Sequence, residues 1–193
     1  VRFYRRFLRS LVRQARYLRR TADHASRGVD RVEAAVALNY AALCIAGQAR
    51  HVTSAGERLK REIKRQILPD GGHVSRDPGA IIELLLDLLP LRQAFASRNI
   101  APPPALLSAI ERMMPMLRFF RHSDGTLARF NGMGATPADL LLTLLAYDET
   151  YGAPLSNASY SGYQRLEAAG GVLLMDTGRA PPLEMSLEAH AGC

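Results

Sequence analysis

Cysteine is scarce in this chain of 193 residues, and long uninterrupted apolar runs are missing. The two cysteines, Cys44 and Cys193, belong to no Cys-x-x-Cys pair and no Cys/His spacing, which argues against a structural zinc site. Cys44 lies within an apolar helical pattern, where we expect a small buried side chain. Asp87 and Pro90 interrupt the longest apolar stretch before it reaches the roughly 20 residues that a membrane span needs, so no span is predicted.

Acidic residues are also absent from the start of the chain, where eight arginines precede the first acid, Asp23. A helix of this charge, in a chain of net charge +7, could bind a membrane surface, a nucleic acid or an anionic polysaccharide. The alternative is a solvated face opposite an apolar stripe that includes Phe3 and Phe7. Aromatic residues are not interleaved with the arginines as a base-stacking platform requires, so nucleic acid is not an expected partner.

Proline and glycine divide the first three quarters of the chain into amphipathic segments of helical period. With 48% hydrophobic residues the chain can bury a core. No sequence repeat of fixed period is present, so an ordinary repeat protein is not indicated. Paired helices joined by short polar turns predict stacked helical hairpins, which close into an α/α toroid or continue as a solenoid. The expected helices are 3–22, 31–50, 53–67, 78–97, 104–121 and 138–147, with Asp30 capping the second.

After Gly152 the pattern changes to short alternating runs that are typical of strands. Gly170-Gly171 joins the first two of them as an expected hairpin turn. We therefore predict a mainly α fold, with a helical domain at 1–154 and the truncated start of an antiparallel β-sandwich at 155–193. Because the chain lacks an initial Met and stops directly after a strand-like run, we expect an internal piece of a longer protein. The expected strands are 163–167, 172–176 and 185–190.

The most informative segment is the connection between the third and fourth expected helices. Pro69 ends a cationic helix, and Asp70-Gly71-Gly72 supplies the positive φ angles of a reversal. Asp77-Pro78 then opens the next helix as an N-cap residue followed by proline at the first helical position. This helical hairpin carries His73 and Arg76 in its loop, a common position for binding and catalytic groups.

The segment Gln66-Ile67-Leu68-Pro69-Asp70-Gly71-Gly72-His73, followed by strands at 161–166 and 172–178, resembles the heparinase II/III family of polysaccharide lyases. The resemblance covers roughly residues 30–193. It implies an α/α toroid before a β-sandwich, with an acidic, uronate-containing polysaccharide as the partner and its cleavage by β-elimination as the activity. It also implies a structural divalent metal in the sandwich domain and a periplasmic or cell-envelope location.

The sequence departs from that family at three catalytic positions. Ala80 and Ile81 stand where the family has a Tyr-His pair, and Val29-Asp30 stands where it has an early Asn-His. Glu188-Ala189-His190-Ala191-Gly192 keeps only the second histidine of a His-x-His-x-Asp motif. We therefore expect a lyase with degenerate catalytic residues and weak activity. The alternative is a non-catalytic carbohydrate-binding or cell-envelope protein of the same fold.

Six residues are the candidate site. His73 has the chemistry of an acid or base, or caps its turn; His190 is a second candidate and a possible metal ligand. Asn131, in a glycine-rich turn, offers an amide that could neutralise a carboxylate. Arg76 and Arg129 are candidates for holding the substrate, and Tyr163 for replacing the missing tyrosine. The predicted catalytic residues are His190, His73 and Asn131, and the predicted substrate-binding residues are Arg76, Arg129 and Tyr163.

Overall fold

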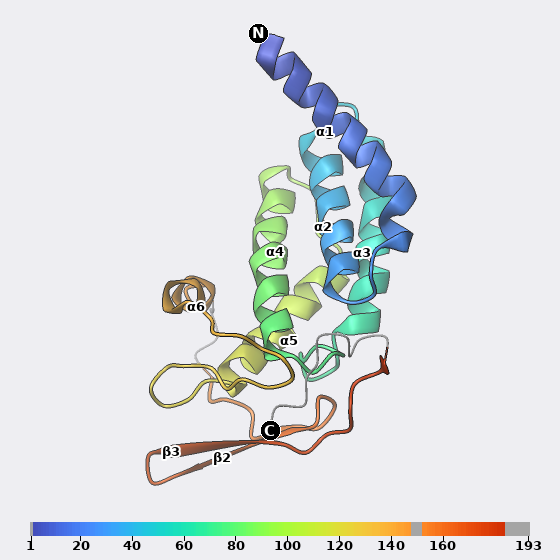
Figure 1. Cartoon of the computed structure of the whole chain (residues 1–193). Helices are drawn as coiled ribbons and strands as arrows, with labels where there is room; N and C mark the ends of the chain where they lie inside the picture. The colour runs from blue at the N-terminus through green and yellow to red at the C-terminus, as the bar shows by residue number, and fades with distance from the viewer. Residues whose placement is uncertain (1, 148–151, 184–193) are drawn as a thin grey trace. The chain divides into compact units, whose positions relative to one another are not determined.

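The structure, a computed structural model, describes residues 2–147 and 152–183 (Figure 1). It is mainly helical, with a small antiparallel sheet near the end of the described chain, which confirms the predicted fold class at this level. The helices are α1 (Arg2–Thr21), α2 (Val29–Cys44), α3 (Val52–Gln66), α4 (Pro78–Ser97), α5 (Pro104–Phe119) and α6 (Ala138–Leu145), with short 3-10 turns η1 (Ala22–His24) and η2 (Ala49–His51). The strands are β1 (Asn157–Ala158), β2 (Tyr163–Ala168) and β3 (Gly171–Asp176).

The chain forms two compact units, and each is assembled from two separate stretches of sequence. Unit 1 comprises residues 1–64 and 87–107, and unit 2 comprises residues 65–86 and 108–193. The sheet therefore shares a unit with the hairpin loop at 66–77. The change from helix to strand near residue 155 does not coincide with a boundary between compact units. The predicted domain division between residues 154 and 155 stays a prediction.

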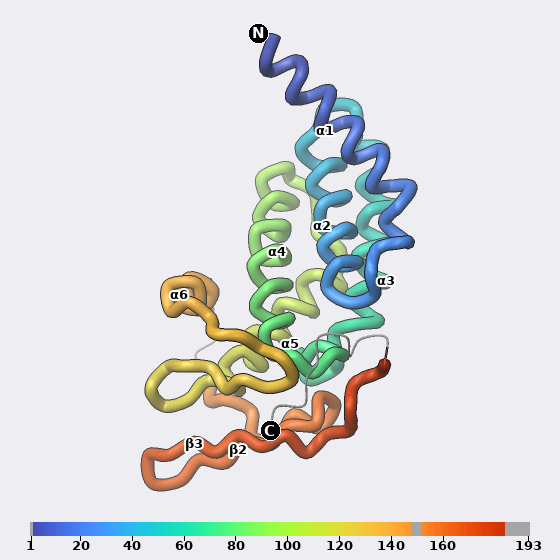
Figure 2. Tube along the Cα trace, viewed as in Figure 1, coloured from blue at the N-terminus to red at the C-terminus, as the bar shows by residue number. Residues whose placement is uncertain are grey.

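Unit 1 is built on small side chains that allow close helix packing. Ala34 and Leu38 of α2 are buried with Ala55 of α3, and Leu18 of α1 packs against this cluster. The Asn39 amide, fully buried, donates to the backbone oxygens of Ala35 and Ala55 at 2.8 and 3.0 Å. α1 runs beside α2, and its first turns extend past that helix (Figure 2).

Unit 2 has an aromatic core. Phe120 and Tyr163 meet edge-on with ring centroids 5.0 Å apart, and Phe130 lies 5.1 Å from the same tyrosine. Arg165 of β2 is also buried and donates to the backbone oxygens of Phe119 and Arg121. These hydrogen bonds occupy the carbonyls left unpaired at the end of α5. The sheet is thereby attached to the end of that helix.

The predicted hairpin of the sheet is confirmed, with its turn one residue earlier than expected. β2 and β3 pair antiparallel from Tyr163 opposite Asp176 to Ala168 opposite Gly171, so Ala169 and Gly170 form the turn. Both have positive φ, +49° and +81°, as a two-residue hairpin requires. β1 was not predicted, and the strand expected at 185–190 lies outside the described residues.

Two smaller expectations were wrong. Asp30 is not the N-cap of α2, because the helix begins at Val29 and Gly28, with φ +104°, precedes it. Cys44 is exposed rather than buried, because it ends α2 where the helix leaves the core. Among the described residues no helix is long and apolar enough to cross a membrane.

Candidate functional site

The loop between α3 and α4 is shaped by its glycines and by Asp70. Gly71 has φ +89°, and a Cβ at this position would lie 2.0 Å from the backbone oxygen of Arg112, so only glycine fits. The Asp70 carboxylate accepts hydrogen bonds from the backbone N–H and the hydroxyl of Ser161, at 2.6 and 2.7 Å. The Asp-Gly-Gly sequence is therefore required by the packing of this turn within unit 2.

His73 is enclosed by this loop, with 2% of its surface exposed. Its Nδ1 lies 2.7 Å from Ser75 Oγ and accepts from the Ser75 backbone N–H at 3.2 Å. Its Nε2 lies 3.0 Å from Gln66 Oε1. An acceptor at Nδ1 and a donor at Nε2 describe a neutral ring, and burial lowers the pKa of His73 to about 4. Of the two roles that the sequence offered for His73, these contacts fit the one in which its side chain caps the turn.

Arg76 is also buried, and its guanidinium joins the loop to the sheet segment. Nε donates to the Ser161 oxygen at 2.8 Å, Nη1 donates to the Arg179 oxygen at 2.6 Å, and Nη2 pairs with the Asp176 carboxylate. The guanidinium carbon lies 5.0 Å from the centre of the Tyr163 ring. Arg76 lines a pocket of about 560 Å³, but its donors are already bound within the protein.

Asn131 and Tyr163 complete the same network. Asn131 has φ +50° in the predicted turn, and its amide donates to the Tyr163 hydroxyl at 2.6 Å and to the Arg76 oxygen at 3.1 Å. The Tyr163 hydroxyl donates to that same oxygen. Burial raises the pKa of the Tyr163 phenol, which makes it a poorer proton donor at neutral pH. The structure brings three predicted site residues, Arg76, Asn131 and Tyr163, together in a network of internal hydrogen bonds, whereas the His73 ring bonds to Ser75 and Gln66 of its own loop.

The remaining predicted residues lie elsewhere. Arg129 is exposed and lines a separate pocket of about 320 Å³ with Arg121 and Asp124. His190 lies outside the described residues. Within the part of the chain that the structure describes, no group of three or more His, Cys, Asp or Glu side chains is placed to hold a metal ion. The predicted divalent metal stays a prediction.

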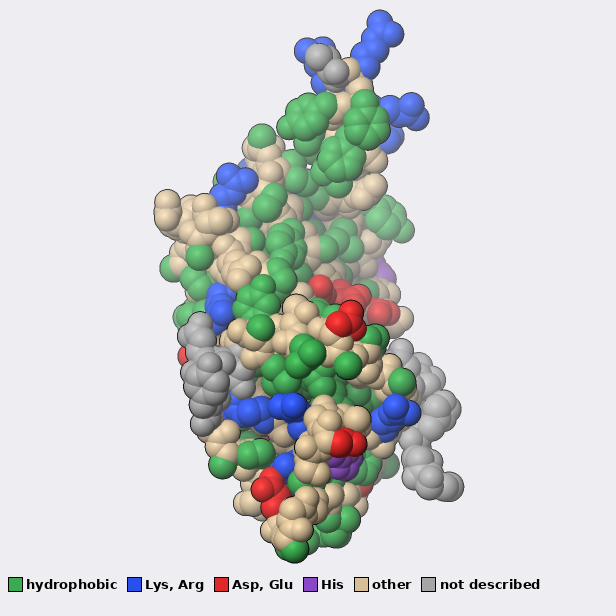
Figure 3. Space-filling model, turned by 90° about the vertical axis from the view of Figure 1, so that its left-hand side faces the viewer, with side chains coloured by type: hydrophobic (Ala, Val, Ile, Leu, Met, Phe, Trp, Pro, Cys, Tyr) green, Lys and Arg blue, Asp and Glu red, His purple; other side chains and the backbone are tan. Residues whose placement is uncertain are grey.

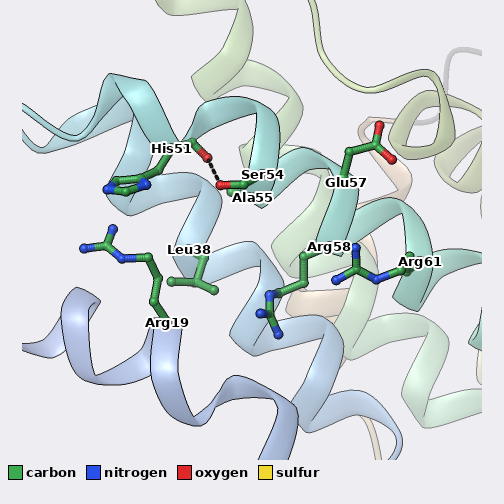
Figure 4. Close-up of a pocket in the computed structure, with 8 residues that line it drawn as sticks. All are labelled: Arg19, Leu38, His51, Ser54, Ala55, Glu57, Arg58 and Arg61. Atoms are coloured by element: carbon green, nitrogen blue, oxygen red, sulfur yellow. Dashed lines mark hydrogen bonds between the residues drawn. The ribbon is translucent and has the colours of Figure 1, made fainter.

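The cationic cluster with an open cavity lies in unit 1, and we call it the basic pocket. It has a volume of about 340 Å³. Arg19 extends from α1 toward the His51 ring of η2, while Glu57 of α3 points away from the guanidiniums (Figure 4). Leu38 and Ala55 form an apolar wall. The lining residues are Arg19, Leu38, His51, Ser54, Ala55, Glu57, Arg58 and Arg61.

Positive potential dominates the basic pocket. Arg58 holds the Asp23 carboxylate with both terminal nitrogens, one of them at 3.3 Å. The hydrogen bond from Arg58, and then the charges of Arg58, Arg61 and Arg31, keep the pKa of Asp23 below its ordinary value. Partial desolvation and the charges of Arg19 and Arg50 lower the pKa of His51. The pocket therefore favours an anion.

Sequence reasoning identified the cationic helix that contains Arg58 and Arg61, but not this pocket. The spacing of three residues between them was a usable signal, because it places both on neighbouring turns of one helix face. Arg19 and His51 come from other elements, and no local pattern indicates that they lie beside that face.

The first half of α1 carries exposed aromatic side chains. Phe3 is 81% exposed and Tyr4 63%, and the rings of Phe3 and Phe7 stack with centroids 6.3 Å apart. Hydrophobic side chains gather beside arginines at this end of the molecule (Figure 3). The second half of α1 packs on α2 through Ala15 and Leu18, as an apolar stripe opposite a solvated face predicts. Phe3 and Phe7, which the sequence analysis placed in that stripe, are exposed instead.

One relative is found by comparison with known proteins. Over 183 residues, 94% of its length, the chain is 33% identical to FtsZ-localized protein C of Caulobacter vibrioides (strain NA1000 / CB15N). The chain spans 31% of that relative's length. No protein-family model and no solved structure matches the chain.

These findings contradict the resemblance to the heparinase II/III family and the predicted polysaccharide lyase function. The family is not matched, and nearly the whole chain aligns with a protein of another description. The physical reason is that the shared residues serve the turn: Asp70 and Gly71 have packing roles that need no catalytic function. Ala80 and Ile81, at the positions of the family's Tyr-His pair, lie in the core at 4% and 1% exposure.

Proposed function

We propose that this chain is a binding module of a cell-division protein that associates with FtsZ. The observation that carries this proposal is the 33% identity with FtsZ-localized protein C along 94% of the chain. Because the chain spans 31% of that relative, the association belongs to the longer protein, to which this segment contributes.

The geometry supports binding rather than catalysis. In unit 2, His73 is neutral and enclosed, and the Arg76 and Asn131 side chains donate to internal acceptors. In unit 1, the basic pocket is open and carries three arginines against one glutamate. A surface of this kind recognises acidic groups on a partner without a reaction. The finer architecture, an α/α toroid followed by a β-sandwich, stays a prediction.

Imaging and direct binding test the association. We expect a fluorescent fusion of the full-length protein to coincide with FtsZ in living cells and to disperse when FtsZ is depleted. Purified full-length protein should bind purified FtsZ in surface plasmon resonance, and deletion of residues 2–183 should weaken that binding. A fusion that keeps its position without FtsZ, together with no binding in vitro, would refute the proposal. The same imaging tests the predicted cell-envelope location.

A second candidate function is attachment to an anionic membrane surface through α1. The exposed Phe3, Tyr4 and Phe7, in a helix with no acidic residue, are the features of an interfacial amphipathic helix. The apolar side chains would enter the boundary between headgroups and acyl chains, and the arginines would contact anionic lipid.

Vesicle sedimentation measures this second function. The full-length protein should sediment with vesicles that contain phosphatidylglycerol and remain in solution with phosphatidylcholine alone. Replacing Phe3 and Phe7 together by serine should weaken binding by about tenfold or more, because two exposed aromatic side chains that would enter the membrane are lost. Tyr160→Ser removes an aromatic side chain of similar exposure in unit 2 and should have no effect. Equal binding of both variants to anionic vesicles would exclude α1 as the contact.

A further inference from the structure

The basic pocket has features that specify its ligand more closely than the proposed function does. We propose that it is a docking site for an acidic side chain, an aspartate or glutamate of a partner peptide, held by Arg19, Arg58 and Arg61. The identification of that partner as FtsZ rests on the proposed function, whereas the chemistry of the ligand rests on the pocket alone.

Cationic side chains line the cavity on more than one side. Arg19 comes from α1 and lies beside His51, whereas Arg58 and Arg61 come from successive turns of α3, so guanidiniums from two helices line the cavity (Figure 4). The Nη1 of Arg19 donates to Gln48 Oε1 at 2.9 Å. Because this amide oxygen is neutral, it does not compensate the positive charge of Arg19. Glu57, the acid of the lining, pairs with Lys60 at 3.1 Å.

The protein already holds a carboxylate at Arg58. Asp23 of η1 receives both terminal nitrogens of Arg58, the two-pronged geometry in which arginine binds a carboxylate. The Asp23 side chain is 73% exposed, so this ion pair is accessible to solvent and to exchange. Asp23 therefore acts as an internal competitor. A partner carboxylate would bind Arg58 together with Asp23 or displace Asp23 from it.

The lining of the pocket suits an acidic side chain better than an inorganic anion. One wall of the pocket is apolar, formed by Leu38 and Ala55, and both residues are almost fully buried. Such a wall suits the methylene groups of an aspartate or glutamate, and it offers nothing to a free phosphate. The volume of about 340 Å³ is near the lower end of the usual range for ligand sites, about 300–1,000 Å³, which suits one or two side chains.

Calorimetric titration of the full-length protein tests the proposal. The probes are a Glu/Asp-rich peptide, its Gln/Asn counterpart of the same length, inorganic phosphate, and vesicles containing phosphatidylglycerol. We expect the acidic peptide to bind and the neutral counterpart to bind at least about tenfold more weakly, because each charged hydrogen bond is lost. Replacing Arg58 and Arg61 together by glutamine should weaken acidic-peptide binding by about tenfold or more.

Asp23→Asn is the sharper test, because the proposal predicts that this substitution increases the affinity for the acidic peptide. Without its internal competitor, Arg58 is free for the partner, and the acidic peptide should bind several-fold more tightly. Arg98→Gln removes an arginine of unit 1 outside the pocket and should leave binding unchanged. The Asp23–Arg58 pair is an exposed ion pair, so these variants should keep the thermal midpoint of the wild type.

The outcomes separate this proposal from the proposed function. If pocket variants bind the acidic peptide and FtsZ as the wild type does, the pocket is not the docking site even though the association stands. If the acidic peptide needs the pocket but FtsZ does not bind at all, the docking site stands and the association fails. Equal binding of the neutral peptide would overturn the proposal. So would pocket-dependent binding of phosphate or vesicles without any binding of acidic peptide.

Discussion

Arg76→Ala is expected to lower the free energy of unfolding of unit 2 by about 3 kcal/mol, because it removes a buried guanidinium that pairs with the partly exposed Asp176 carboxylate and donates to two backbone oxygens. The substitution leaves the Asp176 carboxylate without its guanidinium and the backbone oxygens of Ser161 and Arg179 without donors. It also removes the cation from the Tyr163 ring. Sequence reasoning placed Arg76 in an exposed loop, where a substitution costs less than about 1 kcal/mol; its 9% exposure reverses that expectation.

Amide hydrogen exchange of β2 and β3, followed in denaturant, measures this loss. Arg76→Lys keeps the charge but lacks the planar fork, so its effect should be intermediate. Arg129→Ala, an exposed arginine in the same unit, is the control and should cost less than about 0.5 kcal/mol. A loss for Arg76→Ala no larger than that of the control would show that the network adds no net stability.

The second large effect is a dependence of stability on pH that originates at His73. Its pKa is about 4 in the folded protein against 6.5 for the free side chain, because burial disfavours the charged ring. Between those values the unfolded chain binds more protons than the folded one. The contribution is therefore fully present above pH 6.5 and is lost as the pH falls from 6.5 toward 4. A difference of 2.5 units corresponds to roughly 3 kcal/mol.

His73→Asn provides the comparison, because its amide oxygen can still accept from Ser75 while nothing titrates in this range. Denaturation curves of both proteins from pH 7 to pH 4 should show a steeper loss for the wild type. The loss of stability that both proteins show as the pH falls comes from carboxylates that are present in both. Parallel curves would mean that the His73 ring takes up its proton in the folded protein as readily as in the unfolded one.

The sequence predicted the structural features that depend on neighbouring residues. The Asp77-Pro78 pair predicted the start of α4, and Asp77 Oδ1 accepts from the Gly79 N–H at 2.7 Å, as an N-cap does. The alternation at 163–176 predicted the β2–β3 hairpin, although the turn falls on Ala169 and Gly170. Asn131 was correctly placed in a turn, since asparagine before glycine favours positive φ.

What the sequence could not show depends on residues far apart in the chain. The acceptors of the Arg76 guanidinium come 85 to 103 residues later, and no periodicity connects them with the loop. The φ of +61° at Arg76 was equally hidden, because arginine rarely adopts it and no glycine marks the position. The basic pocket needs Arg19 beside α3, which is a result of packing between helices. The heparinase II/III resemblance was wrong because it treated the residues of a well-packed turn as evidence of catalysis.

The distance along the chain between Arg76 and its acceptors also determines when their hydrogen bonds can form during synthesis. Arg76 is made 103 residues before Arg179, and ribosomes add about 5–20 residues per second. The arginine therefore exists for about 5–20 s before its last acceptor is made. During that interval both partners of the hydrogen bond between His73 and Ser75 are present in the loop between α3 and α4, whereas the strands it finally joins are not yet made. The interior of unit 2 is thus completed late, when residues 157–179 have left the ribosome.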